Sequence, residues 1–175
     1  MDTLYAVLRQ IEAAFGVRIC VHDVSGITFT TRTLALPYIW KTHGCAYCET
    51  AKGFITEKRC MRQKEIALRL LKRNGTRPFF GICNMGVCDY LQPVTQDGKT
   101  LAVVFASGVT REDAAAAREK LSRQALLAGI PPDEALAAFD RFAAQSSVTR
   151  AHLRFFAELI CELILRDVVA GSMRV

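Results

Sequence analysis

The sequence lacks any segment that would place the chain in or across a membrane. Its 175 residues include no apolar run that approaches the ~18 residues needed to span a bilayer. The beginning of the chain carries an acidic residue, Asp2, and has neither the basic region nor the small-residue cleavage site of a secretory signal peptide. We therefore expect a cytoplasmic protein with no membrane partner.

Motifs of catalysis are missing as well. The sequence contains no nucleophile elbow, no glycine-rich phosphate loop and no pair of carboxylates at a catalytic spacing. We therefore expect a protein that is not an enzyme.

Positive charge is present but is not gathered into a binding surface. The formal net charge is +6, and the basic residues are scattered over positions 59–64, 72–73 and 118–123. The sequence shows no basic tail and no recognisable DNA-recognition helix. A solvated surface is the simpler interpretation of this charge, and a nucleic-acid partner is the alternative.

What the sequence does contain is an apolar pattern whose period changes along the chain. Segments with helical spacing alternate with short apolar runs that end at turn residues, as strands do. The predicted elements are, in chain order, a helix at 2–15, strands at 17–23 and 27–33, a helix at 56–74, and strands at 78–83, 87–94 and 101–108. Asp97 and Gly98 predict a hairpin turn before the last strand, which is apolar enough to be central.

This order of elements predicts the fold class α/β, in the α+β sense, with a PAS-like architecture. A leading hairpin, a helical middle and a trailing three-stranded meander predict an antiparallel five-stranded sheet with helices over one face. A ligand pocket would then lie between the sheet and the middle segment.

Beyond residue 110 the pattern predicts only helices, at 111–129, 131–145 and 147–171. The last of them carries an apolar stripe at alternating spacings of three and four residues, formed by Leu153, Phe156, Ile160 and Leu163. This stripe either packs on the domain or pairs with a second copy. We expect a PAS-like domain at 1–110, and a trailing segment at 111–175 that transmits a signal and forms a homodimer through its last helix.

Seven cysteines are many for a cytoplasmic chain of this length. A reducing compartment argues against a disulfide framework, so core packing, metal ligation and redox chemistry are the alternatives. Cys20 and Cys161 lie within apolar runs and are predicted to be core residues.

Cys48, Cys60 and Cys83 are the candidate metal ligands. Thiolates hold Zn²⁺ in a tetrahedron of four ligands, or hold an iron–sulfur cluster. Additional or alternative ligands nearby are Cys45, which forms a CxxC with Cys48, and Cys88 and His43. The competing interpretation is that these thiols pack as small hydrophobic side chains.

Asp89 and Tyr90 follow Gly86 in the region expected to face the pocket. A carboxylate and a phenol at adjacent positions could orient a bound polar ligand. The alternative is that both side chains lie at the surface or at an edge of the sheet without a role in binding.

Taken together, these segments resemble the PocR sensory domain, a PAS-like ligand-binding module of bacterial regulators best known at the N-terminus of AraC-type transcription factors. The resemblance rests on residues 43–64, 77–94 and 97–108. Residues 128–164 are similar to the helical segment that follows the sheet in that family. The resemblance thus covers nearly the whole chain.

Three motifs carry most of the resemblance. Tyr47 and Cys48 match an aromatic–Cys pair, and Cys60 matches a second cysteine after a short spacer. A third motif reads Cys-x-x-Gly-hydrophobic-x-acid-aromatic-x-x-Pro and consists of Cys83, Gly86, Val87, Asp89, Tyr90 and Pro93. The ligand-binding residues that the resemblance implies are Tyr47, Cys48, Cys60, Cys83, Gly86, Asp89 and Tyr90. Asn84 and Cys88 depart from the family pattern, which leaves the fourth ligand of any metal undefined.

The resemblance implies a sensor for a small molecule, such as a short hydrocarbon derivative, that signals through the C-terminal helices to a DNA-binding module. Because no such module is present in this chain, DNA contact is expected only through an output domain elsewhere, and we favour an excised sensor domain over a stand-alone one. A metal or redox sensor that uses Cys48, Cys60 and Cys83 is the alternative function. A dimerisation module with an empty pocket is a third.

Overall fold

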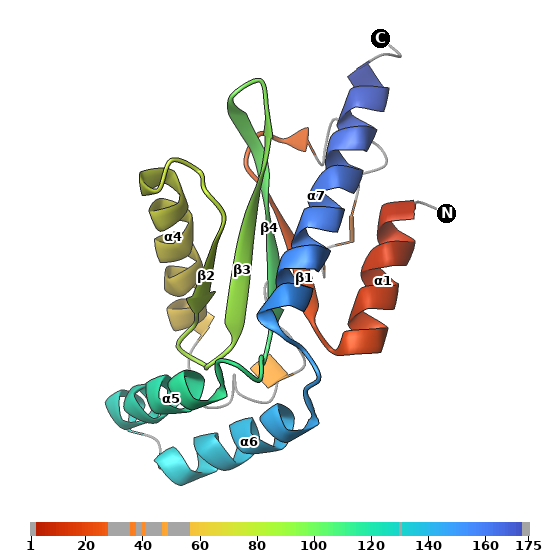
Figure 1. Cartoon of the computed structure of the whole chain (residues 1–175). Coiled ribbons are helices and arrows are strands. Elements are labelled where there is room, and N and C mark those ends of the chain that lie inside the picture. The colour runs from red at the N-terminus through yellow and green to blue at the C-terminus, as the bar shows by residue number, and fades with distance from the viewer. Residues whose placement is uncertain are drawn as a thin grey trace.

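The computed structural model describes residues 3–27, 36–37, 40, 47–48, 57–129 and 131–172. Its elements are α1 (Thr3–Phe15), β1 (Arg18–Asp23), α4 (Glu57–Arg73), β2 (Phe79–Ile82), β3 (Cys88–Gln96), β4 (Lys99–Gly108), α5 (Ala114–Ala128), α6 (Pro132–Gln145) and α7 (Arg150–Ser172). The chain therefore has a mixed α+β fold, shown in Figure 1. None of the helices in these ranges is long and apolar enough to cross a bilayer.

The strands form one antiparallel sheet in the order β1-β4-β3-β2. The prediction that the strand after the Asp97–Gly98 turn is central is confirmed, because β4 pairs with β1 on one side and β3 on the other. The described part of the chain contains a four-stranded sheet rather than the predicted five strands. The missing strand, expected at 27–33, lies outside the described residues except for Ile27.

Helices cover both faces of the sheet, so the prediction of helices over one face is wrong. Successive side chains of a strand point to opposite faces. In β4, Val104 and Ala106 pack in the cluster that includes α1 and α7, whereas Val103 and Phe105 pack toward α4. Figure 1 shows α4 on one side of the sheet and α7 with α1 on the other. The nearly unbroken apolar run of β4 reflects burial on both faces.

The apolar stripe of α7 packs on the sheet. Leu153 and Ile160 are fully buried in the same cluster as Val104 and Ala106, and Phe156 is 4% exposed there. The stripe therefore takes the first of its two predicted roles and is not the dimer contact expected of this helix. The physical reason is that this face of the sheet is apolar and that α7, together with α1, covers it. That the protein forms a homodimer stays a prediction.

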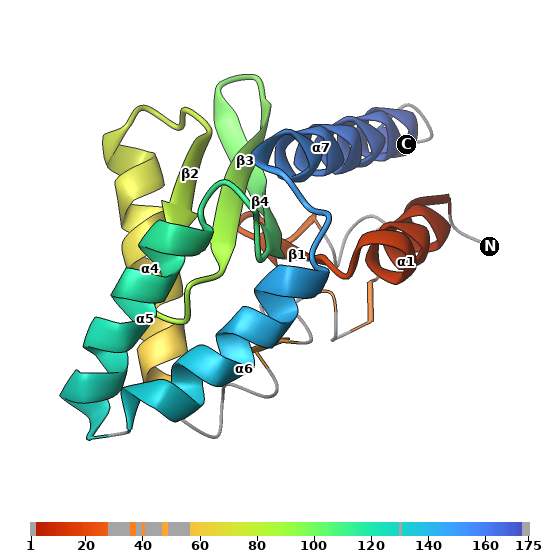
Figure 2. The same cartoon turned by 60° about the horizontal axis from the view of Figure 1, so that its bottom comes forward.

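Helices α5 and α6 form an antiparallel pair below the end of the sheet where β2 turns into β3 (Figure 2). Gly129 ends α5 with a left-handed backbone, φ 72°, and its N–H is directed to the carbonyls of Ala125 and Leu126. The pair shares a core with the β2–β3 turn, in which Leu121 and Phe139 pack with Val87. The trailing helices thus contact the sheet in two places, and the domain boundary at residue 110 stays a prediction.

Candidate functional site

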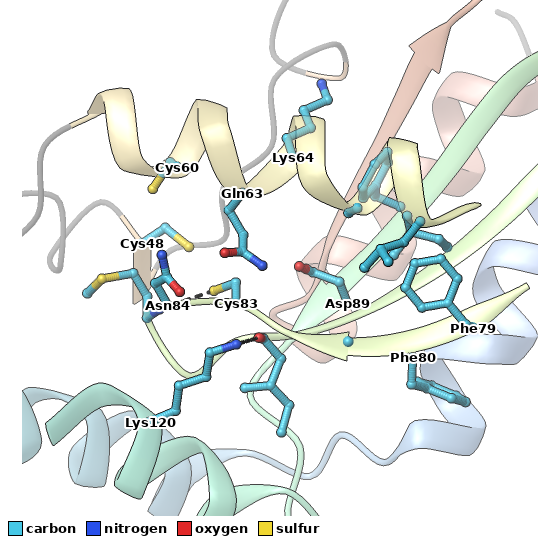
Figure 3. A pocket seen from close by; sticks show the side chains of 17 residues that line it. Cys48, Cys60, Gln63, Lys64, Phe79, Phe80, Cys83, Asn84, Asp89 and Lys120 are labelled. Carbon is cyan, nitrogen blue, oxygen red and sulfur yellow. Dashed lines mark hydrogen bonds between the residues drawn. The ribbon is translucent and has the colours of Figure 1, made fainter. Parts of the chain in front are cut away.

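A cavity of about 340 Å³ lies between α4 and the face of the sheet that α4 covers (Figure 3). Its size falls at the lower end of the range for small-molecule sites, ~300–1,000 Å³. The apolar part of its wall comes from α4 and from strands β2, β3 and β4, through Ala67, Leu70, Phe79, Leu91 and Phe105. Such a wall favours the burial of an alkyl or aromatic group.

The inner face of α4 explains why this helix closes the cavity. Cys60, Ala67 and Leu71 lie along one line of the helix, and Leu71 is 2% exposed against the sheet. This line of the helix therefore faces the cavity and the sheet. Gln63 lies on the same side of α4 and places an amide in the cavity wall. Gln63 was not among the predicted ligand-binding residues, and its place one turn from Cys60 and Ala67 was the signal that could have indicated it.

Asp89, the second residue of β3, supplies a carboxylate to the cavity. Its cross-strand partners are Gly81 on β2 and Ser107 on β4, so no large side chain stands directly beside it on the sheet. Asp89 is 8% exposed. Figure 3 shows the side chains of Asp89 and Gln63 reaching toward each other across the cavity. Small cross-strand neighbours therefore leave the space in which these two polar groups face the cavity.

Cys48, Cys60 and Cys83 also line the cavity, at the end away from Phe79 (Figure 3). The pKa of the Cys83 thiol is raised well above its ordinary value, first by burial and then by the negative charge of Asp89 and the nearby Cys48. Cys83 also accepts a hydrogen bond from the backbone N–H of Met85, at 3.3 Å. Because the thiolate is the nucleophile and the metal ligand, these surroundings disfavour both kinds of chemistry at neutral pH.

The described residues contain no group of three or more His, Cys, Asp or Glu side chains arranged to hold a metal ion. The proposed ligand set of Cys48, Cys60 and Cys83 is therefore not supported, although all three reach the same cavity. Cys45 and His43, the other possible ligands of that region, lie outside the described residues. Cys88 lies on the opposite face of the sheet and is fully buried. Cys20 and Cys161 are buried core residues, as predicted.

Gly86 belongs to the tight turn between β2 and β3 and not to the cavity wall. The turn is closed by a hydrogen bond from the Gly86 N–H to the Cys83 carbonyl, at 3.1 Å, with Gly86 at φ 77°. A Cβ atom at this position would lie 3.0 Å from the Phe139 ring and 3.2 Å from the Cβ of Ala117. Glycine is therefore required here both for backbone conformation and for the approach of α5 and α6.

Tyr90 and Tyr47, two further predicted ligand contacts, do not line the cavity. Tyr90 follows Asp89 in β3 and so points to the other face, where its ring lies 4.6 Å from that of Phe80. Tyr47 is 2% exposed and packs edge-on against Phe139, at 5.8 Å between ring centres. Both tyrosines are part of the packing around the site.

Lys64 and Lys120 bring positive charge to the cavity wall. The Lys64 ammonium lies 4.0 Å from the sulfur of Cys20 and 5.7 Å from the centre of the Phe105 ring. Figure 3 shows it directed away from Gln63 and Asp89. Lys120 comes from α5, and its ammonium donates a hydrogen bond to the carbonyl of Ile82. Since Lys120 lies 38 positions from Ile82 in sequence, no local pattern could have predicted this contact.

A second polar cluster ties the starts of α5 and α7 together. Asp113, which is 4% exposed, accepts hydrogen bonds from the guanidinium of Arg150, at 2.9 Å from Nε, and from the hydroxyl of Thr110, at 2.6 Å. Burial alone would raise the pKa of Asp113, but hydrogen bonds from Arg150, Thr110 and the Cys88 thiol outweigh it and lower that pKa. Burial and the bond to Asp113 raise the pKa of Cys88.

Comparison with known proteins gives one family. The family model described as the sensory domain found in PocR matches residues 1–166. No curated protein and no solved structure gives a significant match to this chain.

Proposed function

Because this chain belongs to the PocR sensory-domain family, we propose that it senses a small molecule bound in the cavity between α4 and the sheet. The observation that carries the proposal is the cavity itself, which combines an apolar wall with the converging polar groups of Asp89 and Gln63. This combination is typical of small-molecule sites, in which apolar surface supplies affinity and a few polar groups supply orientation. A short hydrocarbon derivative with one polar group matches the volume and the lining.

A sensor also needs a connection between its ligand and its output. Phe79 and Phe80 point to opposite faces of β2 (Figure 3), so that a strand in the cavity wall also carries a ring on the α7 side. The guanidinium groups of Arg150 and Arg154 in α7 lie 5.3 Å and 5.6 Å from the centre of the Phe80 ring. A shift of β2 on ligand binding would therefore change contacts of α7.

The β2–β3 turn provides a second connection, to α5 and α6. Cys83 and Met85 line the cavity, and the next residue of the same turn, Gly86, packs against Phe139. A ligand alters the output only if it binds two arrangements of these helices with different affinity. The two contacts are the places where such a difference can arise.

We further propose that the output is a DNA-binding module of a bacterial transcription regulator, of the AraC type, carried outside this chain. In this proposal the protein is cytoplasmic, has no catalytic activity, and acts as a homodimer. The family membership supports the sensory role. The proposed regulatory context is supported by the resemblance to sensory domains of AraC-type transcription factors.

The proposal is tested by blocking the cavity from its own wall. A Cβ atom at Gly81 would meet only the Phe79 ring, at 3.9 Å, so Gly81→Leu adds bulk beside Asp89 with little backbone strain. Wild type, Gly81→Leu and the exposed control Thr95→Leu on β3 are compared by thermal shift against short-chain alcohols, diols, aldehydes and carboxylates.

We expect at least one compound to raise the melting temperature of wild type and Thr95→Leu, and to have no effect on Gly81→Leu. Backbone amide shifts in a ¹⁵N NMR titration should centre on residues 79–91. A ligand that stabilises Gly81→Leu as well as wild type would show that binding occurs elsewhere, and the proposed site would be abandoned.

A further inference from the structure

Lys120 is a cavity residue that comes from the helices after the sheet. All other described lining residues belong to residue 48, α4, the sheet or the β2–β3 turn, whereas Lys120 lies in the middle of α5. It is the one side chain in this set that could contact a ligand and also belong to the trailing helical segment. A direct contact to the ligand from α5 would make helix position depend on occupancy.

The ammonium of Lys120 has unused hydrogen-bonding capacity. It donates to the carbonyl of Ile82, the last residue of β2, as Figure 3 shows. A lysine ammonium carries three N–H donors, so one contact to a carbonyl leaves two. Among the described residues Lys120 forms no ion pair, and the neighbouring carboxylate of Glu119 is engaged with Arg123 at 3.1 Å.

The surroundings of Lys120 favour a negatively charged partner. The ammonium is half-buried beside the apolar cavity, and partial burial of an unpaired charge is unfavourable. Hydrogen bonds between an ammonium and a carboxylate are roughly twice as strong as those between neutral groups. The carboxylate of Asp89, in the cavity wall, is directed toward Gln63 (Figure 3). Elsewhere on the wall, Phe79, Leu91 and Phe105 offer apolar surface to the remainder of a ligand.

From this geometry we infer that Lys120 binds the acidic group of the ligand, and that the ligand is a small carboxylate with an alkyl or aromatic chain. This inference rests on the proposed function of the cavity and adds the chemical class of its ligand. The carboxylate would accept hydrogen bonds from the free N–H groups of Lys120, at the part of the cavity wall that α5 contributes. The chain would lie along the apolar wall, and α5 would follow the position of the bound carboxylate.

Two probes with the same alkyl chain test the inference: butanoate and butan-1-ol. Each is titrated into the ¹⁵N-labelled full chain, as wild type and as Lys120→Met, Lys120→Gln and Lys99→Met. Gln retains a donor for the Ile82 carbonyl without the charge, and Lys99 is an exposed lysine of β4 outside the cavity wall. Circular dichroism and the melting temperature of each variant establish that it is folded.

We expect wild type and Lys99→Met to bind butanoate about 10-fold more tightly than butan-1-ol, as one charge-assisted hydrogen bond would produce. Both Lys120 variants should lose this preference while keeping their affinity for butan-1-ol. Butanoate should also perturb the amides of Ala114–Ala128 in wild type but not in Lys120→Gln.

Equal affinity of wild type for the two probes, or a butanoate preference that survives in Lys120→Gln, would overturn the inference and leave the proposed function standing. If no compound of the panel perturbs residues 79–91 of the wild-type chain, the inference and the proposed function fail together. A Lys120→Met chain that does not fold leaves the decision to Lys120→Gln, which keeps the donor to Ile82.

Discussion

Asp113, at the start of α5, accepts hydrogen bonds from the guanidinium of Arg150, the first residue of α7. The carboxylate is almost completely buried, whereas the arginine side chain is 47% exposed. Removal of one partner therefore has a different consequence from removal of the other. Removal of the Arg150 side chain leaves a buried carboxylate without its cation, whereas removal of the Asp113 carboxylate leaves a guanidinium that water can solvate.

This difference predicts an order of stabilities. Arg150→Met should lower the free energy of unfolding by about 3 kcal/mol, because it leaves Asp113 buried without its cation. Asp113→Asn should lower it less, by about 1–2 kcal/mol, since a neutral amide remains. Urea denaturation measures both variants.

The exposed pair Arg118–Asp140, at 3.1 Å with side chains 52% and 48% exposed, is the matched control. Asp140→Asn should change the free energy of unfolding by less than about 1 kcal/mol. Equal losses for Arg150→Met and Asp140→Asn would show that the Asp113–Arg150 pair contributes no more than a surface pair.

Acidification should weaken the fold through the same carboxylate. The pKa of Asp113 in the folded protein is lower than its ordinary value of 3.8. Its contribution to stability is therefore complete above pH 3.8 and is lost as the pH falls below that value through the folded-state pKa. Wild type should lose stability in this range faster than Asp113→Asn, so the difference between their unfolding free energies should narrow. A difference that stays constant down to the acid limit would contradict the lowered pKa.

Gly86 should tolerate substitution less well than a glycine with similar backbone geometry. Gly86 and Gly98 both have positive φ, 77° and 73°, so Ala at either position should cost about 1–2 kcal/mol in backbone strain. A Cβ atom at Gly98 has no neighbour within 4 Å, whereas at Gly86 it would meet the Phe139 ring and Ala117. Overpacking should therefore add about 1–3 kcal/mol to the loss in Gly86→Ala.

The comparison of Gly86→Ala with Gly98→Ala in urea isolates this packing contribution, because the strain is common to both. If the two variants had the same unfolding midpoint, α5 and α6 would be able to move away from the added methyl group at Gly86 at little cost in free energy. The second proposed connection between cavity and helices would then lose its basis.

The buried thiols should react slowly in the native protein. Burial is the main cause that raises the pKa of Cys20 to about 11 and that of Cys161 to about 11. Burial also raises the pKa of Cys83, which lines the cavity. Alkylation by iodoacetamide at pH 8, followed by mass spectrometry, should label these three at least about 10-fold more slowly in the native chain than in urea, since only the thiolate reacts.

Fast labelling of native Cys83 would be the informative exception. It would show an accessible thiolate in the cavity and return the cysteine-based redox sensor to consideration. Slow labelling of Cys83 beside fast labelling of the same residue in urea would support its role as a packed wall residue.

Several elements of this fold could be read from local patterns. The helix at Glu57–Arg73 and the strands at Phe79–Ile82 and Cys88–Gln96 lie within a few residues of their predicted positions. Alternation along β3 also implied that Asp89 and Tyr90 point to opposite faces of the sheet, so that only Asp89 of the two lines this cavity. The unbroken apolar run of β4 likewise indicated two covered faces.

Other features had no local signal. The stripe of α7 predicted an apolar contact, but whether its partner was the sheet or a second copy depended on a surface elsewhere in the chain. Lys120 reaches the cavity because α5 packs closely against the β2–β3 turn. Gly86 makes this close approach possible, since it has no Cβ atom to meet Ala117 of α5. Tyr47, beside Cys48 in the chain, packs in the core against Phe139.

Local patterns were enough to predict the helices, most strands, the burial of Cys20 and Cys161 and the family of this protein, because periodicity and motifs are properties of neighbouring residues. Which faces meet depended on the packed chain: α4 and α7 lie on opposite sides of the sheet, Asp89 rather than Tyr90 lines the cavity, and a lysine of α5 reaches its wall. The physical reason is that an apolar face specifies burial but not a partner, and the partner is chosen by the packing of the whole chain.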